Sequence, residues 1–168
     1  MNLYIDFDGV IMNTIDVTYE DLKNKGLNTK SPENAEAIRN YYATMDWEEL
    51  LNKRATFINN AVECINNIVA SKKFNVSILT HVTSLKEAVE KINYTRKYLN
   101  NITIIPVPRD VSKTSMVKTK NAILIDDYVG NLEEWKNNGG MGVKFSTELK
   151  GKGFPVINRL DQILELDL

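Results

Sequence analysis

The sequence predicts an α/β fold: a doubly wound, Rossmann-like parallel sheet with helices on both faces and a small helical cap inserted after the first strand. Short apolar runs alternate along the chain with segments of helical periodicity, the pattern of strands joined by crossover helices. Two of the apolar runs, at 2–5 and 122–125, end directly in paired carboxylates, and parallel sheets gather their reactive groups at the carboxyl edge. A length of 168 residues suits one domain with a modest insertion.

The first strand ends in the sequence Asp6-Phe7-Asp8-Gly9. Residues two apart on a strand point to the same side, so the carboxylates of Asp6 and Asp8 are expected to face one side together. Neighbouring negative charges repel each other unless a cation binds them or they share a proton. The pair therefore indicates a magnesium site or an acid–base pair, the alternative being a strand that ends in a solvated acidic turn.

Four helical patterns follow the first strand. Gly26 is a stop signal for the first, Ser31-Pro32 is a start signal for the second, and a capping box at 46–49 begins the third. The fourth is expected from about Arg54 to Ser71, on a face formed by Phe57, Ala61, Ile65, Ile68 and Val69.

These helices are more than one crossover connection needs. We therefore predict that residues 14–67 form a helical cap over the carboxylate edge, while residues 1–13 and 68–168 form the core. Caps of this kind close over a substrate and exclude water.

The rest of the chain continues the alternation. A strand at 76–79 ends in Thr80, and a capping box at 84–87 opens a helix to about Leu99. That helix is expected to turn its apolar residues inward, namely Leu85, Ala88, Val89 and Ile92. The remaining elements are predicted in this order: a strand at 102–105 closed by Pro106, a loop that becomes a helix near Lys113, the 122–125 strand, a short helix capped by Asn131, an edge strand at 142–145 and an amphipathic helix from Arg159 to Leu166.

Composition narrows the possible partners. Apolar residues make up 43% of the chain and the net charge is −1, so no nucleic-acid polymer is expected as a partner. The single cysteine, Cys64, lies in a helical pattern where a buried, inert thiol is expected.

With no signal-peptide pattern and no apolar run long enough to cross a membrane, we expect a soluble, cytoplasmic protein without a membrane partner. A homodimer through the cap or the edge strand stays an open alternative.

Four features occur in a defined order along the chain: a strand with Asp6 and Asp8, a strand ending in Thr80, then Lys113, and a strand ending in Asp126-Asp127. In this order they resemble the motif series of the haloacid dehalogenase-like (HAD) superfamily, and the resemblance covers the whole chain. The receiver domain of response regulators also has carboxylates, a threonine and a lysine at strand ends. Its paired acids come first, its phosphorylated aspartate next, and its threonine and lysine after that, so the order in this chain argues against a receiver domain. Within the superfamily, the chain is most similar to the C-type 5'-nucleotidase family, which contains the 5'(3')-deoxyribonucleotidases. The stretches that carry this closer likeness are residues 6–10, 109–110 ahead of 113–114, and above all 125–135.

The resemblance implies roles for the carboxylates. Asp6 would be the nucleophile that becomes an aspartyl phosphate, and Asp8 the acid that protonates the leaving oxygen and later activates water. The implied cofactor is Mg²⁺, held by Asp6, by the backbone carbonyl of Asp8 and by Asp126. Asp127 would be either a further ligand or the holder of a bound water.

Two further groups are expected to balance the charge of a bound phosphoryl group. Thr80, at a strand tip, can donate a hydrogen bond from its hydroxyl group. Lys113 is the expected cation, and Lys118 and Lys120 compete for the role. Lys113 is preferred because it lies where loop becomes helix, whereas the other two lie close to the following strand and are expected to face solvent.

The resemblance thus implies a magnesium-dependent phosphomonoesterase for a small phosphorylated metabolite, with a nucleoside or deoxynucleoside monophosphate as the expected substrate. Tyr41 and Trp47 of the cap are the candidates for contact with the substrate, against the alternative that they only pack the cap. His81 is expected near the mouth of the site, as a loop residue rather than a catalyst, and it is a further candidate for contact with the substrate. Two alternatives remain: a phosphatase for a sugar phosphate or another small phosphorylated metabolite, and a non-catalytic protein that binds a phosphorylated ligand.

Overall fold

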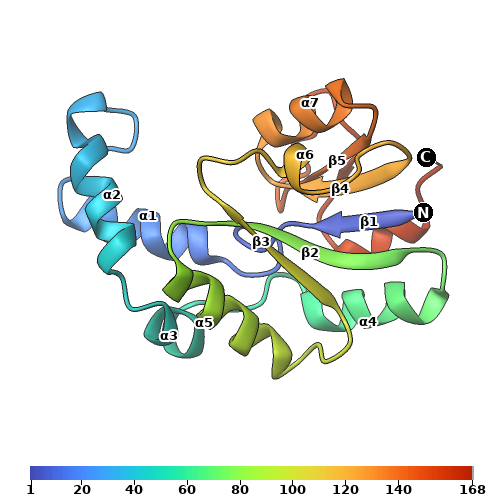
Figure 1. Ribbon diagram of the computed structural model, residues 1–168, viewed down its shortest axis with the longest axis horizontal. Helices are drawn as coiled ribbons and strands as arrows, with labels where there is room; N and C mark the ends of the chain where they lie inside the picture. Colours follow the sequence, from blue (N-terminus) through green and yellow to red (C-terminus); the bar gives the residue numbers. More distant parts are fainter. Residues whose placement is uncertain (168) are drawn as a thin grey trace.

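Six parallel strands form one sheet in the computed structural model, which describes residues 1–167 (Figure 1). Their order across the sheet is β3-β2-β1-β4-β5-β6. This order runs outward from β1 in both directions, so the crevice between β1 and β4 is the topological switch point of a doubly wound sheet. The predicted fold class is confirmed. The strands are β1 (Asn2–Ile5), β2 (Asn75–Val82), β3 (Thr103–Pro108), β4 (Ala122–Asp126), β5 (Met141–Phe145) and β6 (Val156–Ile157).

Helices cover both faces of the sheet (Figure 1). Helices α4 and α5 lie on one face and α6 and α7 on the other, while α1 and α2 extend away from the sheet. The α-helices are α1 (Thr14–Asn24), α2 (Ala35–Thr44), α3 (Trp47–Glu49), α4 (Ala61–Ser71), α5 (Leu85–Arg96), α6 (Lys113–Met116) and α7 (Val129–Asn137). Three other helical turns are η1 (Pro32–Asn34), the π-helical η2 (Leu50–Arg54) and η3 (Leu160–Leu164). No helix of the described residues is long and apolar enough to span a bilayer.

The central strand divides its side chains between two cores. Leu3 and Ile5 of β1 belong to the larger cluster, which includes residues of α4, and Tyr4 belongs to the smaller one beneath α7. Successive strand residues point to opposite faces, so an uninterrupted apolar run is the expected sequence of a strand covered on both sides. The fully buried Trp135 closes the smaller core, where its Nε1 donates to the Ala122 carbonyl oxygen at 3.1 Å. These two cores fix the position of β1, and with it the two aspartates that follow.

The predicted helix from Arg54 to Ser71 is wrong in its first part. Arg54 ends η2, and α4 begins only at Ala61. Between them, Asn59 and Asn60 have positive φ angles, which a continuous right-handed helix cannot contain. Phe57 lies in this connection and pairs with Met12 through an isolated β-bridge. Because α4 runs past residue 67, the predicted boundary between cap and core falls inside this helix.

The predicted inward face of α5 is wrong in part: Ala88 is buried as predicted, but other residues of that face are not. Leu85 is 81% exposed and Val89 is 43% exposed, although both are apolar. The buried side of the helix instead carries polar residues that reach toward the carboxyl edge of the sheet: Glu87, Lys91 and Thr95, with Ala88 and Tyr94. Apolar periodicity gave the wrong face because these polar groups have charged or hydrogen-bonding partners inside the protein.

Three other boundaries differ from the predictions. β5 is not the edge strand, because β6 pairs with it and forms that edge of the sheet. The predicted last helix is the short 3₁₀ turn η3. Pro106 does not close β3, which continues to Pro108. An edge strand tolerates proline because the missing N–H can face away from the sheet. The N–H of the next residue, Arg109, donates inward to the Val82 carbonyl oxygen at 2.9 Å, which places both proline nitrogens on the outer side.

Candidate active site

Three carboxylates meet at the carboxyl ends of β1 and β4. Asp6 follows β1 directly, Asp126 is the last residue of β4, and Asp127 comes next. One oxygen from each lies within 4.8 Å of the other two. Asp126 is fully buried and Asp6 nearly so. The parallel pairing of Ile5 with Ile125 explains this convergence, since it brings the residues that follow each strand to the same height.

Lys113 lies between two of these carboxylates. Its Nζ is 2.9 Å from Asp6 Oδ1 and 2.7 Å from Asp126 Oδ2, and the side chain is 2% exposed. Lys113 begins α6, and Ser112 caps this helix by accepting a hydrogen bond from the Thr114 N–H. Lys118 and Lys120, the competing candidates, are both exposed. The structure therefore brings Lys113 to the carboxylates.

Other groups hold the Asp126 and Asp127 loop in place. The side-chain amide of Asn131 donates to Asp126 Oδ2 at 2.9 Å, and the backbone N–H of Tyr128 donates to Oδ1 at 2.8 Å. Lys144 Nζ donates to the backbone carbonyl of Asp127 at 2.5 Å. Asn131 was predicted as the helix cap, but α7 begins at Val129 and Asn131 lies in its first turn, where its side chain reaches the carboxylate instead.

Asp8 and Thr80 form the other side of the site. Thr14, the first residue of α1, donates to Asp8 Oδ1 at 2.7 Å, and the fully buried Thr80 lies with its Oγ1 3.4 Å from Asp8 Oδ2. Lys91 Nζ is 2.5 Å from the same Oδ2 atom. The four motif residues Asp6, Asp8, Thr80 and Asp126 thus gather around the ends of β1, β2 and β4.

The electrostatics of the cluster favour a cation. Burial and then the repulsion from neighbouring carboxylates raise the pKa of Asp6 to about 8, although Lys113 opposes the shift. Burial and the charge of Asp126 similarly raise the pKa of Asp127 to about 7. Asp6 Oδ1 is buried and makes no aligned hydrogen bond, despite its short distance to Lys113. Several carboxylate oxygens with an unsatisfied acceptor among them suit a hard divalent cation such as Mg²⁺.

The three predicted substrate contacts lie in different surroundings. The His81 Nε2 atom is 3.0 Å from the Val111 carbonyl oxygen, and burial lowers the pKa of this histidine. His81 belongs to β2 and not to a loop. Trp47 is 3% exposed and packs in the larger core, with its Nε1 unpaired.

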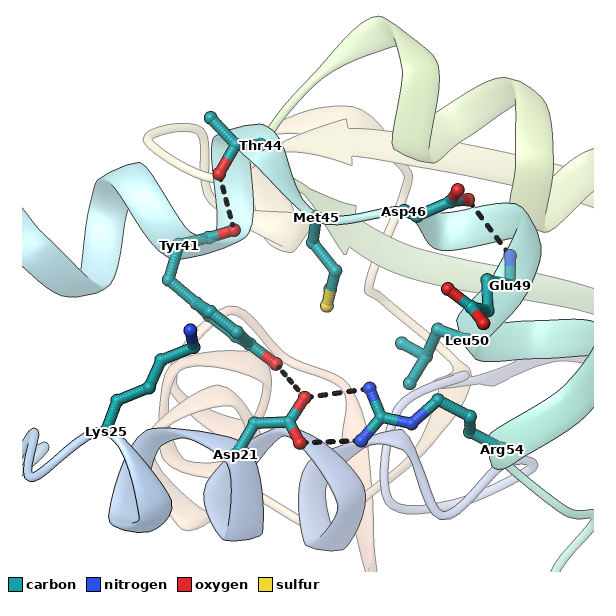
Figure 2. A pocket seen from close by; sticks show the side chains of 9 residues that line it. All are labelled: Asp21, Lys25, Tyr41, Thr44, Met45, Asp46, Glu49, Leu50 and Arg54. Atoms are coloured by element: carbon teal, nitrogen blue, oxygen red, sulfur yellow. Dashed lines mark hydrogen bonds and ion pairs between the residues drawn. The ribbon is translucent and has the colours of Figure 1, made fainter.

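Tyr41 points into a separate pocket of about 250 Å³ between α1, α2 and α3 (Figure 2). Its hydroxyl group donates to Asp21 at 2.7 Å, and Arg54 binds the same carboxylate through two nitrogens. The carboxylates that follow β1 and β4 do not line this pocket. Tyr41 thus joins a paired network within the predicted cap.

Sequence reasoning missed four groups at the site: Thr14, Lys91, Asn131 as a side-chain donor, and Lys144. Only the spacing of Glu87 and Lys91, which are four residues apart on one helix face, was a visible signal for any of them. Thr14 and Lys144 carry no pattern that distinguishes them from ordinary helix and strand residues.

Gly9 gives a test of the carboxylate geometry. It has a φ of +73°, and a Cβ atom there would lie 2.6 Å from Asp127 Oδ2. We expect Gly9→Ala to displace this carboxylate and to weaken Mg²⁺ binding by roughly 10-fold or more, besides the cost of about 1–2 kcal/mol for a left-handed alanine. Calorimetric titration with Mg²⁺ and urea unfolding measure the two effects.

The matched control is Gly26→Ala. Gly26 has a nearly identical φ of +70° but no atom within 4 Å of its Cβ position. The control should lose a similar amount of stability from backbone strain and keep its affinity for Mg²⁺. Equal Mg²⁺ affinity in both variants would contradict the expected role of the Gly9 contact.

No protein-family model matches the chain, and no curated protein matches it. Solved structures do match it over nearly their whole length. A HAD-superfamily hydrolase from Ehrlichia chaffeensis aligns over 98% of this chain and 94% of its own, with a TM-score of 0.59 and 9% identity. A haloacid dehalogenase-like hydrolase from Streptococcus pneumoniae aligns over 98% and 96%, with a TM-score of 0.65 and 12% identity. A predicted phosphoglycolate phosphatase from Haemophilus somnus aligns over 98% and 96%, with a TM-score of 0.57 and 10% identity. The chain therefore has the fold of HAD-superfamily hydrolases.

Proposed function

We propose that this protein is a magnesium-dependent phosphomonoesterase that works through an aspartyl-phosphate intermediate on Asp6. The observation that carries the proposal is the convergence of three carboxylates and one buried lysine at the switch point of the sheet, with Lys113 Nζ 2.9 Å from Asp6 and 2.7 Å from Asp126. Ligands of doubly wound proteins bind at this place in the fold. Fold alone does not determine chemistry, so the proposal depends on the residues of the site.

Asp6, Asp126 and the backbone carbonyl of Asp8 are the groups that would hold Mg²⁺, with Asp127 as a ligand or as an acceptor for a bound water. When bound, the ion would neutralise negative charge on the phosphoryl oxygens and on the carboxylates themselves. Lys113 adds a fixed positive charge, because the nearby Asp6 and Asp126 keep its pKa above the usual range despite its burial. Such a fixed charge needs no reorganisation when the phosphoryl group arrives.

In the first step, a carboxylate oxygen of Asp6 attacks phosphorus as the bond from phosphorus to the ester oxygen breaks. Asp8 gives its proton to the leaving alkoxide, so an alcohol departs and Asp8 becomes a carboxylate. Thr80 can donate its hydroxyl hydrogen to a phosphoryl oxygen during this transfer.

In the second step, Asp8 takes a proton from water while the water oxygen attacks phosphorus. The bond between Asp6 and phosphorus then breaks, which releases inorganic phosphate and restores both carboxyl groups. The same residue thus acts as acid and then as base.

For the substrate, we propose a nucleoside or deoxynucleoside monophosphate. The support is the sequence of residues 125–135, which resembles the last motif of the C-type 5'-nucleotidases. The helices between residues 14 and 54 would form the cap, and Tyr41, Trp47 and His81 remain candidates for contact with the substrate. A preference for deoxyribose would depend on the residues that contact the sugar.

The test is phosphate release from a panel of ribonucleoside and deoxyribonucleoside monophosphates, sugar phosphates and an aryl phosphate, with Mg²⁺ and with a chelator. We expect turnover that requires Mg²⁺ and is fastest with nucleotides. Turnover of sugar phosphates alone would overturn the nucleotide assignment and keep the chemistry. No turnover of any ester would overturn the enzymatic proposal in favour of a protein that only binds a phosphorylated ligand.

A further inference from the structure

A second buried lysine lies close to the site, on the opposite side from Lys113. Lys91 projects from the middle of α5, and its side chain is 1% exposed. Its Nζ lies 2.5 Å from Asp8 Oδ2, 2.6 Å from Glu87 Oε1 and 3.1 Å from the His81 carbonyl oxygen. An ammonium group has three hydrogens to donate, so these three acceptors satisfy it completely.

The two lysines contact different carboxylates. Lys113 binds Asp6 and Asp126, whereas Lys91 binds Asp8 and Glu87. In the proposed reaction, the partners of Lys113 are the nucleophile Asp6 and the metal ligand Asp126. The partner of Lys91 in the site is Asp8, the residue that transfers protons.

Glu87 is in turn fixed by the turn that precedes α5. Both the backbone N–H and the hydroxyl group of Thr83 donate to Glu87 Oε2 at 2.7 Å. Glu87 Oε2 therefore accepts two hydrogen bonds from Thr83, while Glu87 Oε1 binds the Lys91 ammonium group. The result is a chain of contacts from Thr83 through Glu87 and Lys91 to Asp8.

The other oxygen of Asp8 is also occupied. Thr14 donates to Asp8 Oδ1 at 2.7 Å, so the carboxyl group is held from both ends. The ring of Trp47, from α3, faces Lys91 Nζ at 4.9 Å, and the ring of Phe7 lies at 5.5 Å. These aromatic contacts hold the ammonium between the core and the predicted cap.

A buried glutamate and lysine are costly for folding, since well-packed apolar residues of similar volume are often at least as stable. Their presence in the interior is better explained by the groups they hold in place than by a contribution to stability. Proton transfer needs the acid within hydrogen-bond reach of the leaving oxygen, and small displacements of a catalytic group cost large factors in rate.

We propose that Lys91 is a positioning residue for the acid–base carboxylate Asp8, anchored by Glu87 and enclosed by Trp47. The inference rests on the proposed phosphatase function and adds a residue to it. Lys91 acts through Asp8, so its importance should depend on how strongly the leaving group needs a proton.

Two aryl esters separate this role from a general structural one. Phenyl phosphate releases a weakly acidic phenol that benefits from protonation, whereas dinitrophenyl phosphate releases an anion that is stable without it. For Lys91→Met, we expect kcat/KM to fall roughly 100-fold with phenyl phosphate. With dinitrophenyl phosphate, kcat/KM should change by less than about 3-fold, because this constant reports only steps up to leaving-group departure.

Two further variants complete the experiment. Lys86→Met changes an exposed lysine of the same helix and should leave both constants near wild type. The double variant Glu87→Gln/Lys91→Met removes both buried charges, so it avoids an unpaired carboxylate if the single variant folds poorly. It should show the same selective loss.

Equal losses with the two esters in the double variant, or no loss with either, would overturn the positioning role while the phosphatase function stands. If the wild-type protein hydrolyses neither these two esters nor any nucleotide or sugar phosphate of the panel in the presence of Mg²⁺, the proposed function fails, and this inference fails with it. If only nucleotides turn over, unchanged kcat/KM of the double variant with the best nucleotide would overturn the positioning role, because the alkoxide that leaves a nucleotide needs a proton. Selective loss with phenyl phosphate alone would support both.

Discussion

Asp6→Asn is expected to reduce phosphatase turnover by roughly 10⁴-fold or more, because an amide cannot form the covalent phosphoryl intermediate. The fold should survive this change. Asparagine has nearly the same shape as aspartate, and Lys113 keeps its other carboxylate partner, Asp126, at 2.7 Å. Steady-state phosphate release with the best substrate of the panel measures the loss, and urea unfolding measures the stability.

Asp16→Asn is the matched control, since Asp16 is an exposed carboxylate in the first turn of α1. It should keep wild-type activity. Incubation with substrate and rapid acid quench should trap phosphate on the wild-type chain and none on Asp6→Asn. Substantial turnover by Asp6→Asn would exclude covalent catalysis through this residue.

Lys113→Ala is expected to lower kcat/KM by about 10²–10³-fold, because it removes a fixed positive charge from the place where phosphoryl charge develops. It should also destabilise the fold by about 3–5 kcal/mol in a chelator, since Asp6 and Asp126 would be left without their shared partner. Excess Mg²⁺ should recover part of this stability by binding the same carboxylates. Thermal unfolding with and without Mg²⁺ checks the second effect independently of activity.

Lys118→Ala removes an exposed lysine that lies shortly after α6 and should change activity by less than about 2-fold. A larger loss in Lys118→Ala than in Lys113→Ala would show that the cation was assigned to the wrong residue. Both variants therefore have to be assayed at a temperature where each is folded.

The positions of the motif residues could be predicted because they depend on strand ends. Asp6 and Asp126 follow continuous apolar runs, and parallel pairing brings the ends of such runs together. Lys113 could be chosen over its neighbours because it begins a helix. In each case a local pattern in the chain was enough to predict where the residue lies, while its role stays a proposal.

The contribution of Glu87 and Lys91 to the other side of the site could not be predicted in this way. Leu85 and Val89 gave α5 an apolar face, and the structure exposes both and buries Glu87 and Lys91 instead. Charged residues are assigned to the surface by default, because burying a charge is unfavourable without a partner. The partner here is Asp8, which is 83 positions away in the sequence. Only a three-dimensional structure brings the two together.

The helix boundaries failed for a related reason. The predicted helix extends toward Arg54 because Phe57 lies at helical spacing from Ala61, but the backbone from Ala55 to Asn60 pairs with the segment after β1 instead. The Ile58 N–H donates to the Ile11 carbonyl oxygen at 2.9 Å, a contact that no local propensity encodes. Tertiary hydrogen bonds thus override the helical pattern in this segment.

The two ends of the sheet also determine how copies of this chain can meet. On β3, the nitrogens of Pro106 and Pro108 face outward, so this border lacks two donors that an incoming strand would need. At the opposite border, β6 offers only two residues for pairing. Both borders are therefore poor templates for strand addition, which should protect the protein from edge-to-edge aggregation at high concentration. If two copies associate, side-chain contacts between other surfaces are the expected mode, rather than a sheet that continues from one chain into the next.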